Sequence, residues 1–579
     1  MTLDRYTKAN RELWNDWADV HVGSRFYDVA GFKAGACALR SLEVDELGDV
    51  RGKSLLHLQC HFGLDTLSWA RRGARVTGID LSDHAVDAAR ALADELGIGA
   101  TFICAPLYDL EDALEGEFDI VYTSYGAIEW LPDLDRWARL VGRCLRPGGT
   151  FYMAEIHPFA QMLDETAAGN GDIAVAFPYF PTDEPIRDET QGTYADPEAR
   201  VEHNVCYTWQ HSYEAVFDAL LGAGLAIEYL HEFPFSVAPF WSCMFRDDDG
   251  WWYLPGPDGA GRREDVPFLY SIRAGKPTAA VTGGEPAPGA QAAAATPGMA
   301  AAPAPPPAVD ATKYNDANRA LWDELVSIHE ASELYDVEGF LAGRDTLTAI
   351  ERRELAPRVA GKDLLHLQCH LGLDTLTLAR QGARVTGVDF SGEAVATARR
   401  LAADAGLEAR FVQADVLALD IVLDERFDIV CTSWGVLLWL PDLGRWAAQI
   451  RRALKPGGLF YIAEFHPAGY ALDDRAESEV VRPGYSYFHS DEPLCVDDGG
   501  DYADPAAKVA HTRSFEWTHT MGDIVSSLTG AGLEIEFLHE FPYTIGLTWP
   551  FLVTGSDGLK RVRGHEEQFP LSFSLLARG

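Results

Sequence analysis

Two segments of the chain carry the same polar side chains in the same order. The segment 54–82 reads SLLHLQCHFGLDTLSWARRGARVTGIDLS, and the segment 363–391 repeats it as DLLHLQCHLGLDTLTLARQGARVTGVDFS. In the first copy, His57 and Gln59 follow an apolar run, and Asp80 ends the next apolar run. A carboxylate in that position can accept hydrogen bonds from a pair of hydroxyl groups, such as those of a ribose. The chain therefore holds two copies of one binding segment.

A strand, a loop, a helix and a second strand are needed to position these side chains. Residues 55–58 predict the first strand, and Gly63 ends the loop. A helix starts near Asp65, and residues 75–79 predict the second strand. This order is a βαβ nucleotide-binding unit, which could hold NAD, FAD or S-adenosylmethionine, because each ligand can place a ribose diol against the carboxylate.

The loop sequence separates these ligands. A dinucleotide fold uses GxGxxG so that bare backbone can approach the pyrophosphate, whereas residues 59–63 read QCHFG. A nicotinamide oxidoreductase is therefore the least favoured interpretation. His57, Cys60 and His61 are suitable metal ligands, but a strand-loop-helix turn would point them in different directions, and no pair has zinc-like spacing. We expect no metal site.

Strands and helices alternate along each half, which predicts a parallel sheet with helices on both faces. The first half is expected to contain strands 54–58, 75–79, 101–105, 118–123, 150–155, 225–230 and 267–273, helices 64–72, 83–96, 133–145 and 212–223, and a turn at 146–149. A helical cap precedes the first strand, and a loop-rich insertion follows the fifth. The second half repeats this order, with strands 427–433, 533–538 and 570–577 and helix 521–531.

The two halves align almost throughout, and a low-complexity segment separates them. Residues 276–311 are rich in Ala and Pro, which predicts a flexible linker. We therefore expect one domain at 1–275 and a second at 312–579, packed against each other as an intramolecular pseudo-dimer.

The order of these motifs resembles the class I S-adenosylmethionine-dependent methyltransferases over nearly all of each half. The shared features are Asp-Leu-Ser at 80–82, Phe-Asp at 118–119 and the LRPGG turn at 145–149. The resemblance implies an α/β fold with two Rossmann-like domains. Each would have a mostly parallel seven-stranded sheet whose last strand, at 267–273 or 570–578, is antiparallel. It also implies S-adenosyl-L-methionine as the cofactor.

The first motif departs from that family. His57 stands where the family usually has an acid, and Gln59 and His61 stand where it has glycines. The same LHLQCH variant occurs in a bacterial subgroup that otherwise resembles small-molecule methyltransferases. We interpret it as an altered cofactor loop, and a lost cofactor site is the competing interpretation.

The resemblance implies cofactor contacts at matching positions. Asp80 and Asp389 would hold the ribose hydroxyls, and Asp415 would accept the adenine amino group. The first half has Pro106 at the position of Asp415, so we expect the second site to be the more conventional one. The other expected cofactor-binding residues are Leu81 and Phe390, which would pack on the adenine, and His57, Gln59, Gly63, Ala105, Ser124, His366, Gln368, Gly372 and Ser433.

Reacting groups in an open α/β sheet lie beyond the carboxyl ends of the strands. His157 and its twin His466 follow the fifth strand, and an imidazole titrates near neutral pH, so they are the expected catalytic bases. A hydrogen bond that fixes the following Pro-containing turn is the alternative. Tyr125, Trp434 and Glu129 are also expected near the reacting atoms, and the second half has leucine at the position of Glu129.

Aromatic and histidine side chains of the N-terminal cap could close over the cofactor and exclude water. The expected substrate-binding residues are Tyr6, Trp14, His21, Tyr27 and His211 in the first half and Tyr314, Trp322, His329, Tyr335 and His519 in the second. Core packing is the alternative for the aromatic residues, and a helix-capping or structural role is the alternative for His211 and His519. The insertion at 156–205 resembles a substrate lid.

The chain is strongly acidic. It has 48 Lys and Arg against 88 Asp and Glu, which gives a net charge of −40, and such a polyanion repels nucleic acid and acidic membranes. Nine cysteines without a CxxC pair indicate a reduced, cytoplasmic protein. No signal core or membrane-spanning segment is expected. We therefore expect a small-molecule substrate and no nucleic-acid or membrane partner.

Together these patterns predict a tandem S-adenosylmethionine-dependent methyltransferase that acts on an O or N atom of a small-molecule metabolite. Two alternatives stay open. One half, 312–579 by preference, is active beside a silent scaffold or regulatory half. Otherwise the chain is an S-adenosylmethionine-dependent enzyme or regulator that does not methylate.

Overall fold

The computed structural model describes residues 4–110, 114, 118–165, 173–256, 261–278, 312–474, 480–497, 499–504, 506–547 and 549–579. Most of the expected linker, at 279–311, lies outside these residues. The domain boundaries 1–275, 276–311 and 312–579 therefore stay predictions.

The first half is built on a seven-stranded sheet with the strand order β10-β14-β5-β4-β1-β2-β3. In chain order these strands are β1 (Ser54–Leu58), β2 (Arg75–Asp80), β3 (Ala100–Cys104), β4 (Phe118–Ser124), β5 (Leu145–Ile156), β10 (Ala226–Phe233) and β14 (Leu269–Gly275). The inner neighbours pair in parallel, and β14 runs antiparallel to both β5 and β10.

The second half repeats this sheet in the order β17-β16-β15-β18-β19-β25-β22. Its strands are β15 (Asp363–Leu367), β16 (Arg384–Asp389), β17 (Ala409–Gln413), β18 (Phe427–Ser433), β19 (Leu454–Phe465), β22 (Glu534–Phe541) and β25 (Ser572–Arg578). Strand β25 is antiparallel to both of its neighbours. The expected α/β class, with two mostly parallel sheets and antiparallel last strands, is confirmed.

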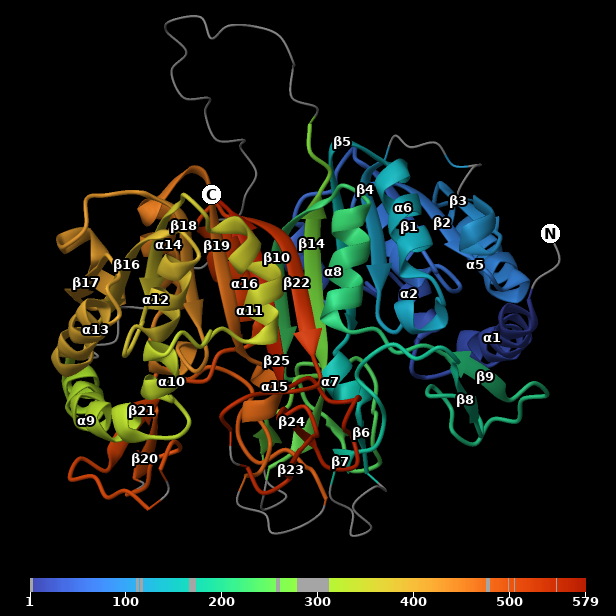
Figure 1. Cartoon of the computed structure of the whole chain (residues 1–579). Coiled ribbons are helices and arrows are strands. Elements are labelled where there is room, and N and C mark those ends of the chain that lie inside the picture. The colour runs from blue at the N-terminus through green and yellow to red at the C-terminus, as the bar shows by residue number, and fades with distance from the viewer. Residues whose placement is uncertain are drawn as a thin grey trace, which may run out of the picture.

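Helices cover both sheets, and three of them precede each sheet as the expected N-terminal cap (Figure 1). The helices of the first half are α1 (Arg5–Gly23), α2 (Val29–Lys33), α3 (Ser41–Leu47), α4 (Leu64–Arg71), α5 (Asp83–Leu96), α6 (Leu134–Cys144), α7 (Pro158–Gln161) and α8 (Tyr213–Gly222). Those of the second half are α9 (Thr312–Ala331), α10 (Val337–Leu341), α11 (Ala349–Glu354), α12 (Leu373–Arg380), α13 (Gly392–Asp404), α14 (Leu443–Ala453), α15 (Pro467–Tyr470) and α16 (Met521–Gly530). None of the described helices is long and apolar enough to cross a membrane.

Short strands form small separate sheets around the two large ones. They are β6 (Leu163–Asp164), β7 (Ala174–Val175), β8 (Ile186–Glu189), β9 (Val205–Thr208), β11 (Phe245–Arg246), β12 (Trp252–Pro255), β13 (Arg262–Arg263), β20 (Leu494–Asp497), β21 (Arg513–Glu516), β23 (Leu552–Thr554) and β24 (Lys560–Val562). The pairs β8–β9 and β20–β21 lie beside the N-terminal caps, because α1 packs against β9 and α9 packs against β21.

Helix α5 illustrates how the sequence sets these bounds. The Ser82 side chain accepts a hydrogen bond from the backbone N–H of Ala85 at 3.0 Å, which satisfies a free donor of the first turn. Ala85 and Ala89 are fully buried one turn apart and face the core. The helix ends at Gly97, whose φ of 64° suits a residue without a Cβ atom.

The expected turn at 146–149 is not a separate element. These residues belong to β5, whose pairing with β4 shifts register between Phe118 and Ile120. Gly148 takes a φ of +74° inside this irregularity, which a residue with a side chain would adopt only with strain. The Pro-Gly-Gly sequence therefore makes a bulge at the start of the strand, and the structure corrects that prediction.

The two halves exchange helix contacts across their edge strands. Helix α16 of the second half packs against β10 of the first, and α8 of the first half packs against β22 of the second (Figure 1). The Ser526 hydroxyl donates to the carbonyl oxygen of Leu230 at 2.6 Å and accepts from the N–H of the same residue at 3.1 Å. One buried apolar cluster includes Leu230, Met521 and Leu538, so the halves share a core.

Candidate functional site

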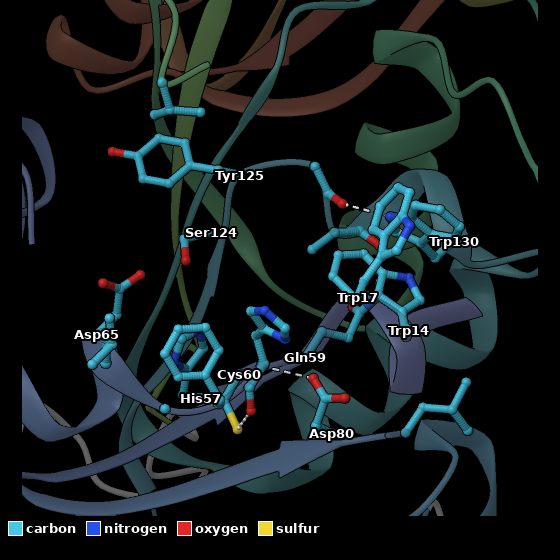
Figure 2. Close-up of a pocket in the computed structure, with 18 of the residues that line it drawn as sticks. Trp14, Trp17, His57, Gln59, Cys60, Asp65, Asp80, Ser124, Tyr125 and Trp130 are labelled. Carbon is cyan, nitrogen blue, oxygen red and sulfur yellow. Dashed lines mark hydrogen bonds between the residues drawn. The ribbon is translucent and has the colours of Figure 1, made fainter. Parts of the chain in front are cut away.

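A cavity of about 750 Å³ opens in the first half, at the carboxyl ends of β1, β2 and β4. Figure 2 shows residues of its lining, with Trp14, Trp17 and Trp130 gathered on one side and Asp65 on the other. Of the residues expected at the cofactor, substrate or reacting atoms in this half, those lining the cavity are Trp14, Tyr27, His57, Gln59, Gly63, Asp80, Leu81, Ala105, Ser124, Tyr125 and Glu129.

The loop after β1 keeps a glycine-like backbone although it carries side chains. Gln59 and His61 have φ angles of 55° and 49°, and Gln368 and His370 have 50° and 47° in the second half. Residues with a Cβ atom adopt this left-handed region at a cost of about 1–2 kcal/mol each. Side chains thus stand at positions whose φ angles favour glycine.

Asp80 ends β2 and is held by backbone N–H groups. Its Oδ2 accepts from His61 N at 2.7 Å, and its Oδ1 accepts from Ser82 N at 2.9 Å. Burial raises the pKa of Asp80 to about 6 despite these bonds. Asp389 in the second half has the same partners, His370 N at 2.8 Å and Ser391 N at 2.9 Å, and burial raises its pKa to about 6.

Buried polar atoms of this loop have unused hydrogen-bonding capacity. Gln59 donates through Nε2 to the carbonyl oxygen of Ala127 at 2.6 Å, while its Oε1 and the Nδ1 of His61 have no partner among the described residues. Gln368 in the second half donates to Val436 O at 2.9 Å and likewise leaves its Oε1 without a described partner. A cavity with a backbone-held carboxylate at the end of β2 and free polar atoms beside it fits the S-adenosylmethionine expected from the sequence.

His57 is buried below the loop. Its Nδ1 lies 2.8 Å from Thr66 Oγ1, and burial lowers the pKa of His57 to about 3. His366 and Thr375 form the same pair at 2.8 Å. Both imidazoles are therefore neutral near pH 7, where the family's acid would carry a charge.

Three acids of the cavity have raised pKa values. Burial raises the pKa of Asp65 to about 6, that of Glu43 to about 7 and that of Glu129 to about 8. The Tyr125 hydroxyl donates to Glu43 at 2.5 Å, and the indole N–H of Trp434 donates to the equivalent Glu351 at 3.1 Å. At neutral pH Glu129 is mostly uncharged and can donate a hydrogen bond.

His157 and His466 lie at the contact between the halves, and His157 is not part of the cavity lining. The Nδ1 of His157 accepts from Phe159 N at 3.0 Å, and its Nε2 lies 2.7 Å from Glu232 Oε1. His466 repeats this, with Ala468 N at 3.1 Å and a carboxylate oxygen at 3.0 Å. Both histidines therefore fix the Pro-containing turns, as in the alternative interpretation of the sequence.

The remaining expected residues of the first half divide between the cavity wall and its support. His21 is fully buried, with its Nδ1 2.9 Å from Nε2 of His61. The Tyr6 hydroxyl donates to Glu184 at 2.8 Å, outside the lining. His211 is a support residue, because its Nε2 lies 3.1 Å and 3.0 Å from the carbonyl oxygens of Ile128 and Leu131.

The second half places the counterparts in the same relationships. Trp322 packs edge-on against His370 at 5.2 Å, and Tyr335 stacks on His329 at 4.9 Å. Tyr314 contacts Phe515, and the Nε2 of His519 lies 2.7 Å from Leu440 O. The other expected cofactor residues of this half are Gly372, with a φ of +72° at the end of the loop, Phe390 after β16, and Ser433 at the end of β18.

Asp415 performs a structural task in this structure. Its side chain accepts from Leu417 N at 2.8 Å and so caps the short 3₁₀ helix at Val416–Ile421. Pro106 at the equivalent position lines the cavity of the first half. The expected difference in cofactor binding between the two sites therefore rests on Asp415, whose carboxylate already accepts a backbone hydrogen bond.

Sequence reasoning missed several residues of the cavity. Trp130 lies just beyond β4, where a position after a strand end could have indicated it, and its indole N–H donates to Gly126 O at 2.9 Å. Trp17 and Phe26 come from the cap, and Glu43 comes from α3 with no local signal of its role. Among the described residues, no group of three or more His, Cys, Asp or Glu side chains could hold a metal ion.

Comparison with protein families and curated proteins identifies relatives of both halves. Two families, each described as a methyltransferase domain, match residues 56–153 and 364–458. The ubiquinone biosynthesis O-methyltransferase of Chromobacterium violaceum is 31% identical over 114 residues, which are 20% of this chain and 49% of that protein. The protein of the same name from Pseudomonas aeruginosa is 30% identical over 119 residues, which are 21% of this chain and 51% of that protein. The chain thus spans about half the length of the curated relatives it matches.

Solved structures are also similar to the chain. An S-adenosylmethionine-dependent methyltransferase from Mesorhizobium loti is 24% identical, and the match covers 41% of this chain and 100% of that one with a TM-score of 0.31. The CcbJ methyltransferase of Streptomyces caelestis is 17% identical, and the match covers 45% of this chain and 98% of that one with a TM-score of 0.30.

Proposed function

Since this chain carries two S-adenosylmethionine-dependent methyltransferase domains in tandem, we propose that both halves bind S-adenosylmethionine and methylate an O or N atom of a small-molecule metabolite. The observation that carries the proposal is the carboxylate of Asp80. It ends β2, is fixed by two backbone N–H groups and lines a cavity of about 750 Å³. Asp389 has the same backbone partners in the second half.

The cofactor, when bound, supplies a methyl group on a positively charged sulfur. Asp80 would accept hydrogen bonds from the ribose hydroxyls, and Leu81 would pack on the adenine. Gln59 Oε1 and His61 Nδ1, which have no described protein partner, would hold polar groups of the methionine end. Holding both reactants in line removes entropy from the reaction step, an effect worth several kcal/mol.

Aromatic side chains would exclude water from the reaction. Trp14 contacts Trp130 at 5.2 Å between ring centroids, and Tyr194 of the insertion contacts Trp17 at 5.6 Å. All four line the cavity. This wall suits a flat, largely apolar acceptor. The curated relatives are named as O-methyltransferases of ubiquinone biosynthesis, which supports an oxygen acceptor.

The two halves would differ in the acceptor that each prefers. Tyr125 is replaced by Trp434, and Glu129 is replaced by Leu438. Because burial raises the pKa of Glu129 to about 8, this residue would donate a hydrogen bond to a neutral acceptor in the first half. The second half has no such donor at that position.

A second candidate keeps one active half beside a scaffold half. The presence of Asp415 in the second half and Pro106 in the first favours 312–579 as the active one. Against it, the loop conformation and the bonds of Asp80 and Asp389 are the same in both halves.

Calorimetric titration of the full chain with S-adenosylmethionine separates these candidates. We expect two sites in the wild type and one each in Asp80→Asn and Asp389→Asn, because the amide accepts the ribose hydroxyls less well. Asp94→Asn, an exposed position on α5, serves as the matched control with two sites. A single wild-type site would support the second candidate, and no binding would overturn both.

Turnover is tested on the same proteins. A metabolite screen with methyl-labelled cofactor should yield S-adenosylhomocysteine and a methylated product in equal amounts. Cofactor binding without any methylated product would favour a regulator or a different reaction.

A further inference from the structure

A hydrogen-bonded chain of three side chains in the second half, two of them buried, has no complete counterpart in the first. The Nε2 of His329 lies 2.9 Å from Asp501 Oδ2, and its Nδ1 lies 2.7 Å from Nε2 of His370. The side chains of His329 and Asp501 are 0% and 1% exposed. Asp501, His329 and His370 thus form a continuous hydrogen-bonded series that ends in the loop after β15.

The first half repeats the two histidines without the acid. His21 Nδ1 lies 2.9 Å from His61 Nε2, and Thr193 occupies the position of Asp501. The Nε2 of His21 is buried and has no partner among the described residues.

The structural equivalence of Thr193 and Asp501 is set by the turn that each one caps. Thr193 Oγ1 accepts from Ala195 N and Asp196 N at 3.1 Å and 3.0 Å. Asp501 Oδ1 accepts from the corresponding N–H groups two and three residues on, at 2.8 Å and 3.0 Å. One oxygen serves the turn in both halves. The aspartate alone has a second oxygen, and that oxygen faces the histidine.

The carboxylate fixes the proton positions along the series. An ionised Asp501 accepts from Nε2–H of His329, which leaves the Nδ1 of His329 as an acceptor. His370 must then donate from its Nε2, so its Nδ1 carries the free electron pair. In the first half nothing described orders the two tautomers in this way.

His370 is placed to meet a ligand. Its backbone N–H donates to Asp389, the expected ribose ligand, at 2.8 Å. Its counterpart His61 lines the cavity of the first half. His370 is only partly buried, and its φ of 47° holds it in the turn.

We propose that Asp501, His329 and His370 form a proton relay in which Nδ1 of His370 takes the proton of the acceptor hydroxyl during methyl transfer in the second half. The proposal rests on the proposed function. As the acceptor oxygen bonds to the methyl carbon, the carbon–sulfur bond breaks, its electron pair stays on sulfur, and the acceptor proton moves to His370. His329 and Asp501 are positioning residues.

Charge balance is the physical reason for the difference between the halves. A proton on the two histidines of the second half is paired with the carboxylate of Asp501, whereas a proton on His21 or His61 would be a buried charge without that partner. The other titratable groups that face the series are Tyr335 and Tyr502, whose rings contact His329, and Asp389, which accepts from the backbone of His370. Burial and the neighbouring His329 lower the pKa of His370 to about 3, although Asp501 raises it, so the ring is neutral at pH 7.

Imidazole NMR on the full chain with labelled histidine tests the relay directly. His370→Gln and His329→Gln assign the two rings. We expect His370 to be protonated on Nε2 alone, and we expect Asp501→Asn to lower the titration midpoint of His370 by about one pH unit or more, because it removes the carboxylate that raises the pKa of this ring. Asp504→Asn, an exposed residue of the same turn, should change neither. An unchanged midpoint and tautomer in Asp501→Asn would overturn the relay.

The first half provides a variant that leaves the second half intact. Thr193→Asp should complete the series there, order the His21 and His61 tautomers and raise their midpoint. No change in a folded Thr193→Asp protein would overturn the inference even if Asp501→Asn failed to fold.

Calorimetry separates the relay from the proposed function. Asp501→Asn should bind S-adenosylmethionine with unchanged stoichiometry, because Asp389 is intact. Once an acceptor is known, the kcat for its methylation by the second half should be at least tenfold lower in Asp501→Asn, with little change in KM. A wild type that binds no cofactor would defeat the proposed function while the NMR result still reports on the series.

Discussion

Tyr487 of the second half donates its hydroxyl hydrogen to Glu232 of the first half, with 2.7 Å between the oxygens. The reciprocal bond joins Tyr179 of the first half to Glu540 of the second at 2.6 Å. Each glutamate also accepts a backbone N–H from the other half, Gly522 at 2.6 Å and Glu214 at 2.7 Å. The Oε1 atom of each glutamate also has a histidine partner in its own half, whereas the Oε2 atom takes its backbone donor from the other half.

Removing one hydroxyl from this contact should destabilise the whole chain. Tyr487→Phe leaves Glu232 with one donor fewer, and we expect a loss of about 1–3 kcal/mol in the free energy of unfolding. Tyr179→Phe should cost a similar amount. Tyr6→Phe, whose hydroxyl bonds the exposed Glu184, is the control with almost no change. Urea unfolding measures all three, and equal stability of Tyr487→Phe and Tyr6→Phe would contradict the structural account.

Separated halves should associate with their own copies. Without the second half, β10 loses its cover by α16, and buried side chains such as Leu230 become exposed. We expect residues 1–278 and 312–579, produced alone, to dimerise or aggregate in sedimentation experiments. A folded monomer at every concentration would show that the shared core is dispensable. Point variants within the full chain are therefore the better test of each site.

Cofactor binding should release protons below neutral pH. Because burial raises the pKa of Asp80 and Asp389 to about 6, both are partly protonated at pH 6, and a cationic ligand favours their ionised forms. We expect affinity to increase from pH 5 to pH 7. Calorimetry in two buffers with different ionisation enthalpies counts the protons, and an affinity independent of pH would contradict the prediction.

The same shift predicts how stability depends on pH without the cofactor. The folded pKa of Asp80, about 6, lies above its unfolded value of about 4. Its contribution is fully present below pH 4 and is lost as pH rises through 6. Asp80→Asn should therefore gain stability relative to the wild type between pH 4 and pH 7. Urea unfolding at both pH values tests this, with Asp94→Asn, at an exposed position of α5, as the control variant.

The left-handed backbone at Gln59 should make any side chain there less favourable for stability than glycine. Its φ of 55° is accessible to glycine without strain, so Gln59→Gly should be more stable than Gln59→Ala by about 1 kcal/mol, although both lose the bond to Ala127. Both variants should bind S-adenosylmethionine more weakly than the wild type. Thermal unfolding measures the stability and calorimetry measures the affinity for the cofactor. An alanine variant as stable as the glycine variant would contradict the prediction of backbone strain.

Local sequence patterns were sufficient to predict the strands of the sheet and the position of the Asp80 carboxylate. The apolar runs at 55–58 and 75–79 alternate with turn signals, and strand formation follows from such short-range chemistry. Asp80 could be located because the carboxyl ends of parallel strands meet at one edge of the sheet. The Pro-Gly-Gly turn was the exception, since these residues form a bulge within β5, between Leu145 and Thr150, which both pair with β4.

Other assignments depended on partners that are distant in the sequence. His157 follows a strand end, as a catalytic histidine would, and only the fold brings Glu232 to within 2.7 Å of it. Glu43 reaches the cavity from α3 and meets Tyr125 across many intervening residues.

The repeated segment at 54–82 and 363–391 was thus determined by the sequence alone, including its carboxylate and its unusual loop. The tertiary structure decided what surrounds that loop. Thr193 and Asp501 lie in the insertion of each half and carry no local signal, yet only the fold brings Asp501 to within 2.9 Å of His329. A side chain's chemistry depends on its neighbours in space, and here those neighbours give two nearly identical segments different capacities for proton transfer.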